Sequence, residues 1–407
     1  MSLSNRKKIL VPIFYRAHLG RLRSVLHAIE RHPQLELQVM SASQAAFGSF
    51  FANIIHSEPR SWRFSLPWYI KAIFLGGRDP LLQKIREEGF SVHSQISLFL
   101  DGGTPTVMAK SVGLGIIKII DEMRRLKPDI VFINADRFEM MALTIAAAYL
   151  NIPIAHNEAG DISGTIDESV RHAITKFAHM HFTATETSRK RVIQMGEDPC
   201  FVFTVGSPVI DILKKIDQTI PEIPGFDIKK PFLLAMLHPV TTQSEEENLR
   251  IVNETISVLE KLKMPTILIG GNSDAHSRAV GPSIASWADN SNHSWLFWAK
   301  WLHPDRYFRA LANAACALGN SSSFIREAAY LGTPAVLVGS RQQGRERGKN
   351  VMEIAVDADK IEKAVRDQLA HGRYPQDLIF GDGNAGEKIA EILATINPSI
   401  QKKFYER

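Results

Sequence analysis

The chain has 407 residues, of which 45% are hydrophobic and 22% charged, a balance typical of globular proteins with packed cores. Its net charge of +5 and pI near 9.1 suit an anionic ligand, but no arginine-lysine block indicates a nucleic-acid partner. Two cysteines are too few for a disulfide framework, which favours a reducing, cytoplasmic compartment. No apolar run reaches the roughly 20 residues of a membrane helix, so we expect no integral membrane segment and no signal peptide.

The beginning of the chain has the pattern of a strand–helix–strand unit. We predict a buried strand at residues 8–15, a tight loop at 16–20, a helix at 22–32 and a second strand at 35–41. Such a unit implies parallel strands joined by a right-handed crossover. Arg16 follows the first strand directly, where its guanidinium could hold a phosphate or carboxylate. An ordinary surface arginine is the alternative interpretation.

Residues 46–90 interrupt this pattern. They are rich in aromatic side chains and are broken by Pro59 and Pro67. Residues 66–75 within them have the spacing of a short amphipathic helix, which we expect to pack against the core or at a subunit interface. A lid over the site and a membrane-surface helix are the alternatives, but one lysine beside a short apolar run gives the membrane little support.

The alternation of strands and helices resumes after this insert. We predict strands at residues 129–134, 152–155, 180–185, 202–205, 232–237, 266–269, 294–297, 316–318 and 335–338. We predict helices at residues 112–126, 140–150, 187–195, 208–215, 244–262, 307–314, 323–331, 361–369 and 386–396. Residues 214–226 contain two prolines and are interpreted as a linker. The sequence therefore predicts an α/β protein with two Rossmann-like, doubly wound halves and a ligand in the cleft between their strand ends.

Residues 151–176 carry the strongest indication of a site. A short strand leads into a polar loop with Glu158, Asp161 and Asp167, and apolar residues at helical spacing then predict a helix. Three carboxylates and His156 therefore crowd the carboxyl end of a strand, the edge at which open α/β sheets bind ligands. Helix capping explains any one acid at the helix start, but it does not require Glu158 directly after an apolar strand.

A second candidate site follows a strand of the other half. Residues 319–323, GNSSS, join that strand to a helix, and hydroxyls and free amides at a helix N-terminus bind anions. Three serines are more than one N-cap requires. Glu327 lies one turn inside the helix and could accept ribose hydroxyls. The sequence has no G-x4-G-K-[ST] and no G-x-G-x-x-G, which argues against a Walker loop and a dinucleotide fingerprint.

Two more segments of the second half point toward the same cleft. His238 ends its first strand, although a histidine bonded to nearby backbone is an equally simple interpretation. Arg341, Arg345 and Arg347 follow its last predicted strand and bring guanidinium groups toward the serine loop, with a solvated charge cluster as the alternative. The histidines around residue 179 lack the H-E-x-x-H spacing, so we predict no metal site.

These motifs together resemble one family. The stretch HNEAGDISGTIDESVRHAITK, with ADRFE before it and HPVTT and GNSSSFIRE after it, is similar to the UDP-N-acetylglucosamine 2-epimerase family, most of all to its hydrolysing branch. The resemblance implies the GT-B arrangement, a UDP-sugar substrate, a homodimer or homotetramer, and no metal or redox cofactor. The implied domains are residues 1–212 with the catalytic carboxylates, 213–385 for the nucleotide, and 386–407 as a C-terminal helix that returns to the first domain.

The chemistry implied by the resemblance is elimination followed by addition. A base removes the proton at C2, UDP leaves from C1, and water or UDP adds back to the glycal with C2 inverted. The residues implied in acid/base chemistry are Asp136, Glu158 and Asp167, with Arg137 and His238 assisting. The residues implied in holding UDP are Arg16, Ser321, Ser322, Glu327 and Arg341. The alternatives are a non-hydrolysing epimerase, a GT-B glycosyltransferase and a catalytically silent sugar-nucleotide sensor.

Three departures from the family pattern concern the sugar more than the reaction class. The loop that is usually E-G-G-E or E-A-G is E-A-G-D here, beginning at Glu158. The usual R-A-D-Y after the first strand is R-A-H-L here, with His18 at the third position, and we expect this departure to alter contacts near the nucleotide or sugar. Phe324 stands where glycine is common, and because it does not readily adopt φ > 0, we expect the loop to approach phosphate differently.

Overall fold

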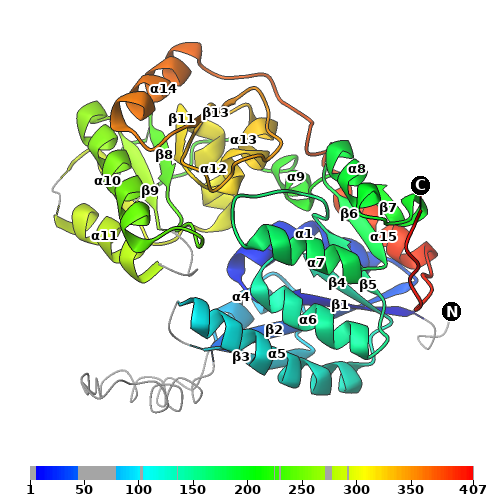
Figure 1. Cartoon of the computed structure of the whole chain (residues 1–407). Helices are drawn as coiled ribbons and strands as arrows, with labels where there is room; N and C mark the ends of the chain where they lie inside the picture. The colour runs from blue at the N-terminus through cyan, green and yellow to red at the C-terminus, as the bar shows by residue number, and fades with distance from the viewer. Residues whose placement is uncertain are drawn as a thin grey trace, which may run out of the picture.

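The computed structural model describes residues 6–44, 79–100, 104–134, 136–223, 225–228, 231–270, 277–290 and 293–406. Within these ranges the chain forms two α/β units side by side, each a parallel sheet with helices on both faces (Figure 1). The first sheet has the strand order β3-β2-β1-β4-β5-β6-β7 and the second the order β10-β9-β8-β11-β12-β13. This is the arrangement of two doubly wound Rossmann-like units, known as GT-B.

The first sheet is buried on both faces, which explains the continuous apolar runs of its strands. Its strands are β1 (Lys7–Ile13), β2 (Leu35–Gln44), β3 (Ser94–Phe99), β4 (Ile130–Asn134), β5 (Ile154–Asn157), β6 (Met180–Thr183) and β7 (Val202–Thr204). Because side chains alternate along a strand, Ile9, Val11 and Ile13 of β1 enter one core cluster while Leu10 enters the other. Its helices are α1 (Arg16–Arg31), α4 (Pro80–Glu87), α5 (Pro105–Leu126), α6 (Phe138–Tyr149), α7 (Asp167–Phe177), α8 (Glu186–Gln194) and α9 (Pro208–Leu213).

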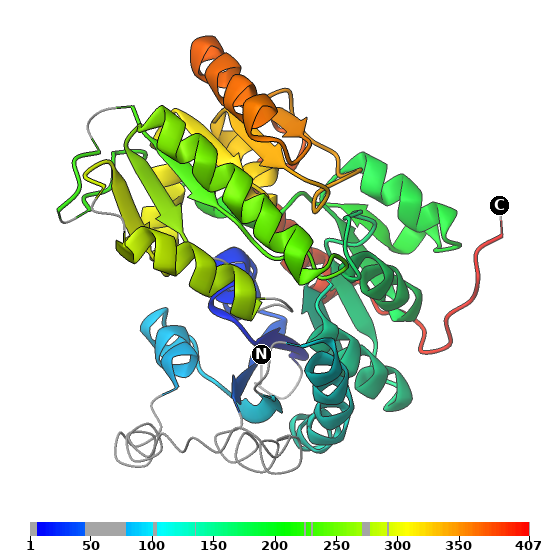
Figure 2. The ribbon, with the colours of Figure 1, turned by 60° about the vertical axis from the view of Figure 1, so that its left-hand side comes forward.

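The second sheet is built in the same way. Its strands are β8 (Leu233–Met236), β9 (Thr266–Ile269), β10 (Leu296–Ala299), β11 (Cys316–Gly319), β12 (Ala335–Val338) and β13 (Val351–Ile354). Its helices are α10 (Glu245–Leu262), α11 (Ser277–Asn290), α12 (Pro304–Asn313), α13 (Arg326–Leu331) and α14 (Ala358–His371). Ser244 and Glu247 form a capping box that starts α10. Figure 2 shows α10 and α11 side by side over one face of this sheet.

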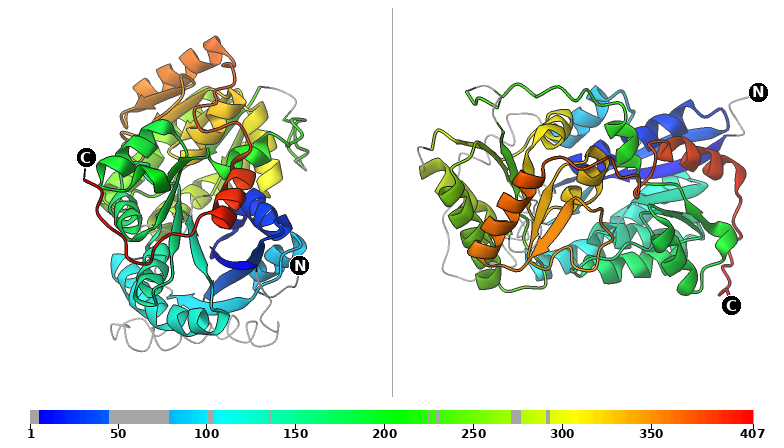
Figure 3. Two further views of the ribbon diagram at one scale, coloured as in Figure 1. Left: turned by 90° about the vertical axis from the view of Figure 1, so that its right-hand side faces the viewer. Right: turned by 90° about the horizontal axis from the view of Figure 1, so that it is seen from above.

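The last helix, α15 (Ala385–Thr395), belongs to the core of the first unit, where it packs against α1 (Figure 3). Asp211 at the end of the first unit accepts hydrogen bonds from the backbone N–H groups of Ala385 (2.8 Å) and Gly386 (2.7 Å). At the other end of α15, Lys7 donates to three backbone carbonyl groups, including that of Leu393 at 2.8 Å. The chain therefore crosses between the units twice, before β8 and before α15.

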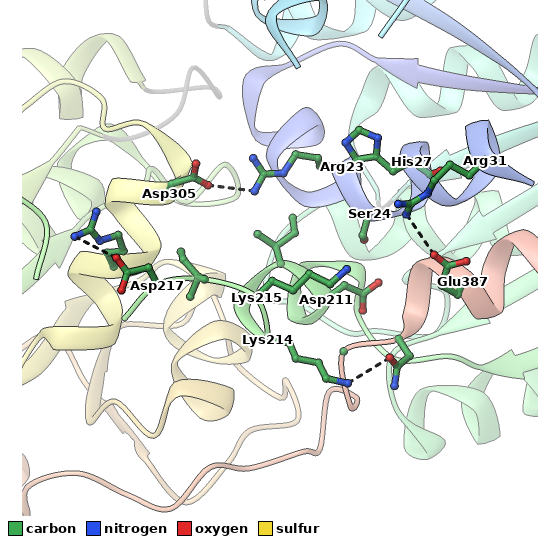
Figure 4. A pocket seen from close by; sticks show the side chains of 15 residues that line it. Arg23, Ser24, His27, Arg31, Asp211, Lys214, Lys215, Asp217, Asp305 and Glu387 are labelled. Carbon is green, nitrogen blue, oxygen red and sulfur yellow. Dashed lines mark hydrogen bonds and ion pairs between the residues drawn. The ribbon is translucent and has the colours of Figure 1, made fainter. Parts of the chain in front are cut away.

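A crevice of about 740 Å³ lies at this double crossing, where α1, α9, α12 and the start of α15 meet (Figure 4). Its carboxylates are paired with, or hydrogen-bonded to, other groups of the protein. Asp211 holds α15, Asp305 pairs with Arg23 at 3.2 Å, and Glu387 pairs with Arg31 at 3.4 Å. The pair between Arg23 and Asp305 joins the two units, so this crevice is the joint between them.

Some predicted elements differ from the structure. Residues 16–20 are the first turns of α1 and not a loop, so that prediction was wrong. Gly20 suggested a turn, but its Cβ position would lie 3.4 Å from Pro304, so the glycine serves close packing between the units. The edge strands β3 and β13 were not predicted. The amphipathic segment predicted at residues 66–75 lies outside the described residues.

None of the helices in the described ranges combines the length and apolar character that a bilayer span requires.

Candidate functional site

A cavity of about 520 Å³ is lined by residues of both units. The side chain of Arg16 lies outside the described part of the chain, although its backbone begins α1. The other residues implied by the family resemblance line this cavity: Asp136, Arg137, Glu158, Asp167, His238, Ser321, Ser322, Glu327 and Arg341. Three further candidates from the sequence, His156, Asp161 and Arg347, are not among its lining residues: His156 is buried beside Thr175, and Arg347 pairs with Glu353. The structure thus brings together residues that are scattered over more than half of the sequence.

Strand order explains why these residues meet. In the first sheet β4 lies next to β5, and Asp136 and Glu158 follow these two strands. In the second sheet β11 lies between β8 and β12, and the serine loop therefore lies between His238 and Arg341. Because all these strands are parallel, their carboxyl ends share one edge, which is where α/β sheets bind ligands.

Asp136 is held by an arginine of its own unit. Arg171 of α7 donates to the Asp136 carboxylate and, at 2.8 Å, to the backbone carbonyl oxygen of Asp161. Its side chain is 1% exposed, so this ion pair forms away from bulk water. The bond to Asp161 also fixes the loop that follows β5. Arg171 was not singled out from the sequence, although a charge between the apolar residues of α7 was an available indication.

Glu158 has a backbone conformation that side chains rarely adopt, with φ of +61°. Strain of this kind persists where the surrounding structure enforces it, and it is found at functional sites. The Glu158 carboxylate accepts a hydrogen bond from Arg326, the first residue of α13 in the other unit, and both side chains are buried. A carboxylate of the first unit is therefore paired with a cation of the second.

Two acids of this loop have pKa values displaced in opposite directions. Burial alone would raise the pKa of the Glu158 carboxyl, but nearby guanidinium groups, first that of Arg326, outweigh burial and lower it. Burial raises the pKa of Asp161, although Arg345 lies 3.6 Å from its carboxylate. Carboxyl groups with separated pKa values are what acid and base roles in one site require.

Asp167 and Arg137 lie at the same edge of the first unit. The hydroxyl of Thr165 donates to the Asp167 carboxylate at 3.1 Å, at the first turn of α7. Arg137 donates to the hydroxyl of Tyr15 at 3.0 Å and to the carboxylate of Glu139 at 2.9 Å. These bonds hold the Arg137 guanidinium 4.3 Å from the centre of the Tyr15 ring. Arg137 is thus positioned by its own unit before any ligand binds.

In the second unit, Asn320 connects the serine loop to His238. Its side chain accepts from the His238 backbone N–H at 2.7 Å and donates to the His238 carbonyl oxygen at 2.8 Å. The Asn320 carbonyl oxygen accepts from Arg341 at 3.1 Å and from Gln342 at 3.0 Å. The three predicted segments of this unit therefore form one hydrogen-bonded assembly, and the predicted proximity of Arg341 to the serine loop is confirmed.

The serines themselves form a short 3-10 turn, Ser322–Phe324, before α13. Ser321 caps this turn, and the hydroxyl of Ser323 is bonded to that of Tyr307. Arg21 of the first unit donates to the hydroxyl of Ser322 at 3.3 Å. Phe324 does not adopt a positive φ, and its side chain is fully buried in the core. The expectation that the loop approaches phosphate differently stays a prediction.

Four further arginines line the cavity: Arg21, Arg171, Arg326 and Arg345. Arg345 was predicted to lie toward the serine loop, whereas the other three were not singled out from the sequence. Arginine is rarely buried without a partner. Arg326 pairs with Glu158 across the cavity, and Arg345 lies 3.6 Å from Asp161. Arg171 pairs with Asp136 of its own unit, and Arg21 donates to Ser322. Grouped guanidinium donors favour a ligand with several negative charges, such as a diphosphate. In the described residues no cluster of histidine, cysteine and acidic side chains has the geometry of a metal site.

Two open parallel sheets that face one cavity, with a serine loop on one and carboxylates on the other, are typical of enzymes of GT-B architecture that act on nucleotide sugars. The family model described as UDP-N-acetylglucosamine 2-epimerase matches residues 71–394. The chain therefore belongs to the UDP-N-acetylglucosamine 2-epimerase family.

Relatives and solved structures agree with this assignment. The chain is 34% identical over 319 residues to the UDP-N,N'-diacetylbacillosamine 2-epimerase (hydrolyzing) of Legionella pneumophila, covering 77% of this chain and 84% of the relative. It is 26% identical over 413 residues to the UDP-N-acetylglucosamine 2-epimerase of Neisseria meningitidis, covering 98% of this chain and 99% of the relative. The fold matches the Methanocaldococcus jannaschii UDP-GlcNAc 2-epimerase in complex with UDP-GlcNAc and UDP, with a TM-score of 0.74, 16% identity, and coverage of 95% and 99% of the two chains.

Proposed function

We propose that this enzyme is a hydrolysing UDP-sugar 2-epimerase, which converts a UDP-2-acetamido sugar into the free 2-epimer and UDP. One observation carries the proposal: carboxylates of the first unit and a histidine and arginines of the second line one cavity. That combination suits a substrate with a sugar carbon to deprotonate and a diphosphate to expel.

The proposed reaction begins with loss of the C2 proton to a carboxylate among Asp136, Glu158 and Asp167. The electron pair of the C2–H bond forms the C1–C2 double bond as the C1–O bond to UDP breaks. His238, the serine loop and the arginines offset the negative charge that develops on the leaving diphosphate. Water then adds at C1 while a proton returns to C2 on the opposite face, which gives the 2-epimer as a free sugar.

Two UDP-sugars are the first candidates for the substrate. The name of the Legionella relative supports UDP-N,N'-diacetylbacillosamine, and the resemblance and the Neisseria relative support UDP-N-acetylglucosamine. The purified protein should be incubated with each in heavy water and followed by NMR. The proposal expects a free 2-epimer, UDP and one deuteron at C2.

The same assay separates the remaining alternatives. A 2-epimer still attached to UDP would identify a non-hydrolysing epimerase, an activity that the name of the Neisseria relative leaves open. Transfer of the sugar to an acceptor without deuterium at C2 would identify a glycosyltransferase. No change in either UDP-sugar would contradict the proposed substrate class.

We also infer a homodimer or homotetramer and a cytoplasmic location. The family resemblance supports the oligomer, while the aromatic segment at residues 62–74, our candidate contact surface, lies outside the described residues. The exposed free thiol of Cys200 supports a reducing compartment. Light scattering of the purified protein tests the oligomer, and fractionation of cells tests the location.

A further inference from the structure

The ion pair between Glu158 and Arg326 crosses the cavity from one unit to the other. The side chain of Glu158 is 6% exposed and that of Arg326 is 1% exposed, so both charges are removed from bulk water. Burying two charges is costly, and the cost is recovered only if the pair is well formed. A carboxylate held in this way has a guanidinium donor on one oxygen and is less available to a substrate.

The cations that surround Glu158 also surround the serine loop. Arg326 follows that loop directly, and Arg21 donates to the hydroxyl of Ser322 at 3.3 Å. Arg345 lies in the same cavity and donates to Gln342 at 3.0 Å. The position that suits a diphosphate, between the serine hydroxyls and the guanidinium groups, is therefore the position from which Glu158 is held.

We propose that Arg326 acts as a lock on Glu158 that the substrate's diphosphate opens, so that this carboxylate becomes an effective base only when substrate is bound. The inference rests on the proposed function, because it assigns the diphosphate to this cavity. The negative charge of the diphosphate competes with the carboxylate for the Arg326 guanidinium. The φ of +61° confines the backbone of Glu158, while the Arg326 guanidinium has a second acidic neighbour, the carboxylate of Glu327 at 3.9 Å.

Opening this ion pair would change the pKa of Glu158. In the unliganded protein, burial favours a raised pKa for Glu158, but Arg326, the foremost of the surrounding cations, holds that pKa below its ordinary value. Negative charges placed among the guanidinium groups would offset them, so the pKa of Glu158 would rise when the diphosphate binds. A base with a higher pKa accepts a carbon-bound proton more effectively. The charged and titratable groups that interact electrostatically with Glu158 are His18, Arg21, Asp161, Arg326 and Arg345. The other charged or titratable side chains that line the same cavity are Tyr15, Asp136, Arg137, Asp167, Arg171, His238, Lys300, Tyr307, Glu327 and Arg341.

Calorimetric titration with UDP in buffers of different ionisation enthalpy tests the lock without catalysis. A rise in the pKa of Glu158 means that the protein takes up protons as UDP binds, at pH values between the free and bound pKa. We expect this uptake in the wild type and its loss in Glu158→Gln. The ionisation of UDP itself is common to both titrations and cancels in the difference.

Arg326→Gln should remove the lock. We expect it to weaken UDP binding by about 10- to 100-fold, since a charged hydrogen-bond donor is lost, and to reduce proton uptake because Glu158 is no longer held. Arg341→Gln is the matched control: it removes another arginine of the cavity, bonded to Asn320, and should weaken binding while leaving the uptake intact. Arg326→Gln with Glu158→Gln removes both buried charges and covers the case in which the single variant does not fold.

The pH dependence of turnover gives a second readout. The acidic limb of kcat/KM reports the free enzyme and that of kcat reports the substrate complex, so we expect the limb of kcat to lie at higher pH. Arg326→Gln should bring the two limbs together. UDP binding with no proton uptake that depends on Glu158 would overturn the lock alone. Absence of UDP binding would overturn the proposed function and the lock with it.

Discussion

Asp136 and Glu158 follow neighbouring strands but are held in different ways. Asp136 is bonded to Arg171 of its own unit and keeps that partner however the units move. Glu158 is bonded to Arg326 of the opposite unit, so its surroundings depend on how the two units are positioned relative to each other. His238 is fixed through its backbone by Asn320 and lines the cavity. At the scale of single residues, Asp136 is therefore held within one unit, whereas Glu158 is held between the two.

The first prediction concerns these three residues. We expect Asp136→Asn, Glu158→Gln and His238→Ala each to lower turnover by about 100-fold or more, because each removes a proton-transfer group or a group that stabilises the leaving UDP. Turnover is measured by release of UDP. Glu186→Gln removes a carboxylate that is 58% exposed and should be without effect. Near-normal turnover in all three variants would contradict the site assignment.

A second prediction at this scale concerns His18, whose Nδ1 atom is buried and has no hydrogen-bond partner within the described part of the chain. Burial, together with Arg137 and Arg21, lowers its pKa from 6.5 to about 3. The unfolded chain therefore binds a proton between pH 6.5 and 3 that the folded protein does not, and stability falls as pH falls through this window.

We expect this single group to account for about 2 kcal/mol of stability lost between pH 7 and pH 5. Between pH 7 and pH 5, the free energy of unfolding of the His18→Leu variant should fall by about 2 kcal/mol less than that of the wild type. Urea unfolding at both pH values measures this difference. His371→Leu, which replaces an exposed histidine of α14, is the control. Equal losses in the wild type and His18→Leu would show that His18 is not kept neutral by the fold.

At the scale of elements, the end of β11 places the serine loop. Gly319 has φ of +141°, and its Cβ position would lie 1.9 Å from the carbonyl oxygen of Met236 in β8. Glycine is required here because β11 and β8 approach closely where both strands end. Asn320 follows at once and binds the backbone of His238. The geometry of the second unit's part of the cavity therefore depends on this one contact between strands.

Gly319→Ala should destabilise the protein by about 3 kcal/mol or more, since it adds backbone strain and a clash. Gly113→Ala is a matched change in the exposed face of α5, where a Cβ meets nothing within 4 Å. This control should instead stabilise the protein by about 0.5 to 1 kcal/mol, because alanine is the better helix former. Urea unfolding measures both, and a similar effect of the two changes would contradict the role given to Gly319.

At the scale of the whole molecule, the loop before α7 touches the second unit directly. Gly164 donates its backbone N–H to the carbonyl oxygen of Arg341 at 3.2 Å. Nearby, Glu346 of the second unit accepts hydrogen bonds from Thr185 at 2.6 Å and Thr187 at 3.0 Å. These contacts hold the loop that carries Asp167 against the segment that carries Arg341. The distance between the acids of the first unit and the arginines of the second therefore depends on the contact between the units.

Gly164→Ala should disturb this separation, because its Cβ would lie 2.2 Å from the carbonyl oxygen of Ser340. Neither unit has to unfold to relieve the clash, since the cleft can open instead. We expect kcat/KM to fall by about tenfold or more, as misplacement by about 1 Å can cost a factor of 100, with little change in Tm. Gly281→Ala in α11, which meets nothing within 4 Å, is the control. A large loss of Tm without loss of activity would contradict the role given to the contact between Gly164 and the second unit.

The sequence by itself determined the two α/β halves and most positions of the site. Apolar periodicity marks buried strands and helices locally, and polar residues directly after a strand must lie at the sheet edge, as Glu158, His238 and Ser321 do. It did not determine that α1 begins at Arg16, because Gly20 has the appearance of a helix breaker and its packing partner, Pro304, belongs to the other unit.

Only the tertiary structure decided which charges meet. Glu158 and Arg326 are 168 positions apart, and their pairing depends on how the two units face each other. No local pattern encodes that contact, since a buried arginine at the start of a helix has the same sequence signature as an exposed one. The physical reason is that spacing along the chain reports which face of an element is buried, whereas the partner of a buried charge is chosen by the packing of whole units.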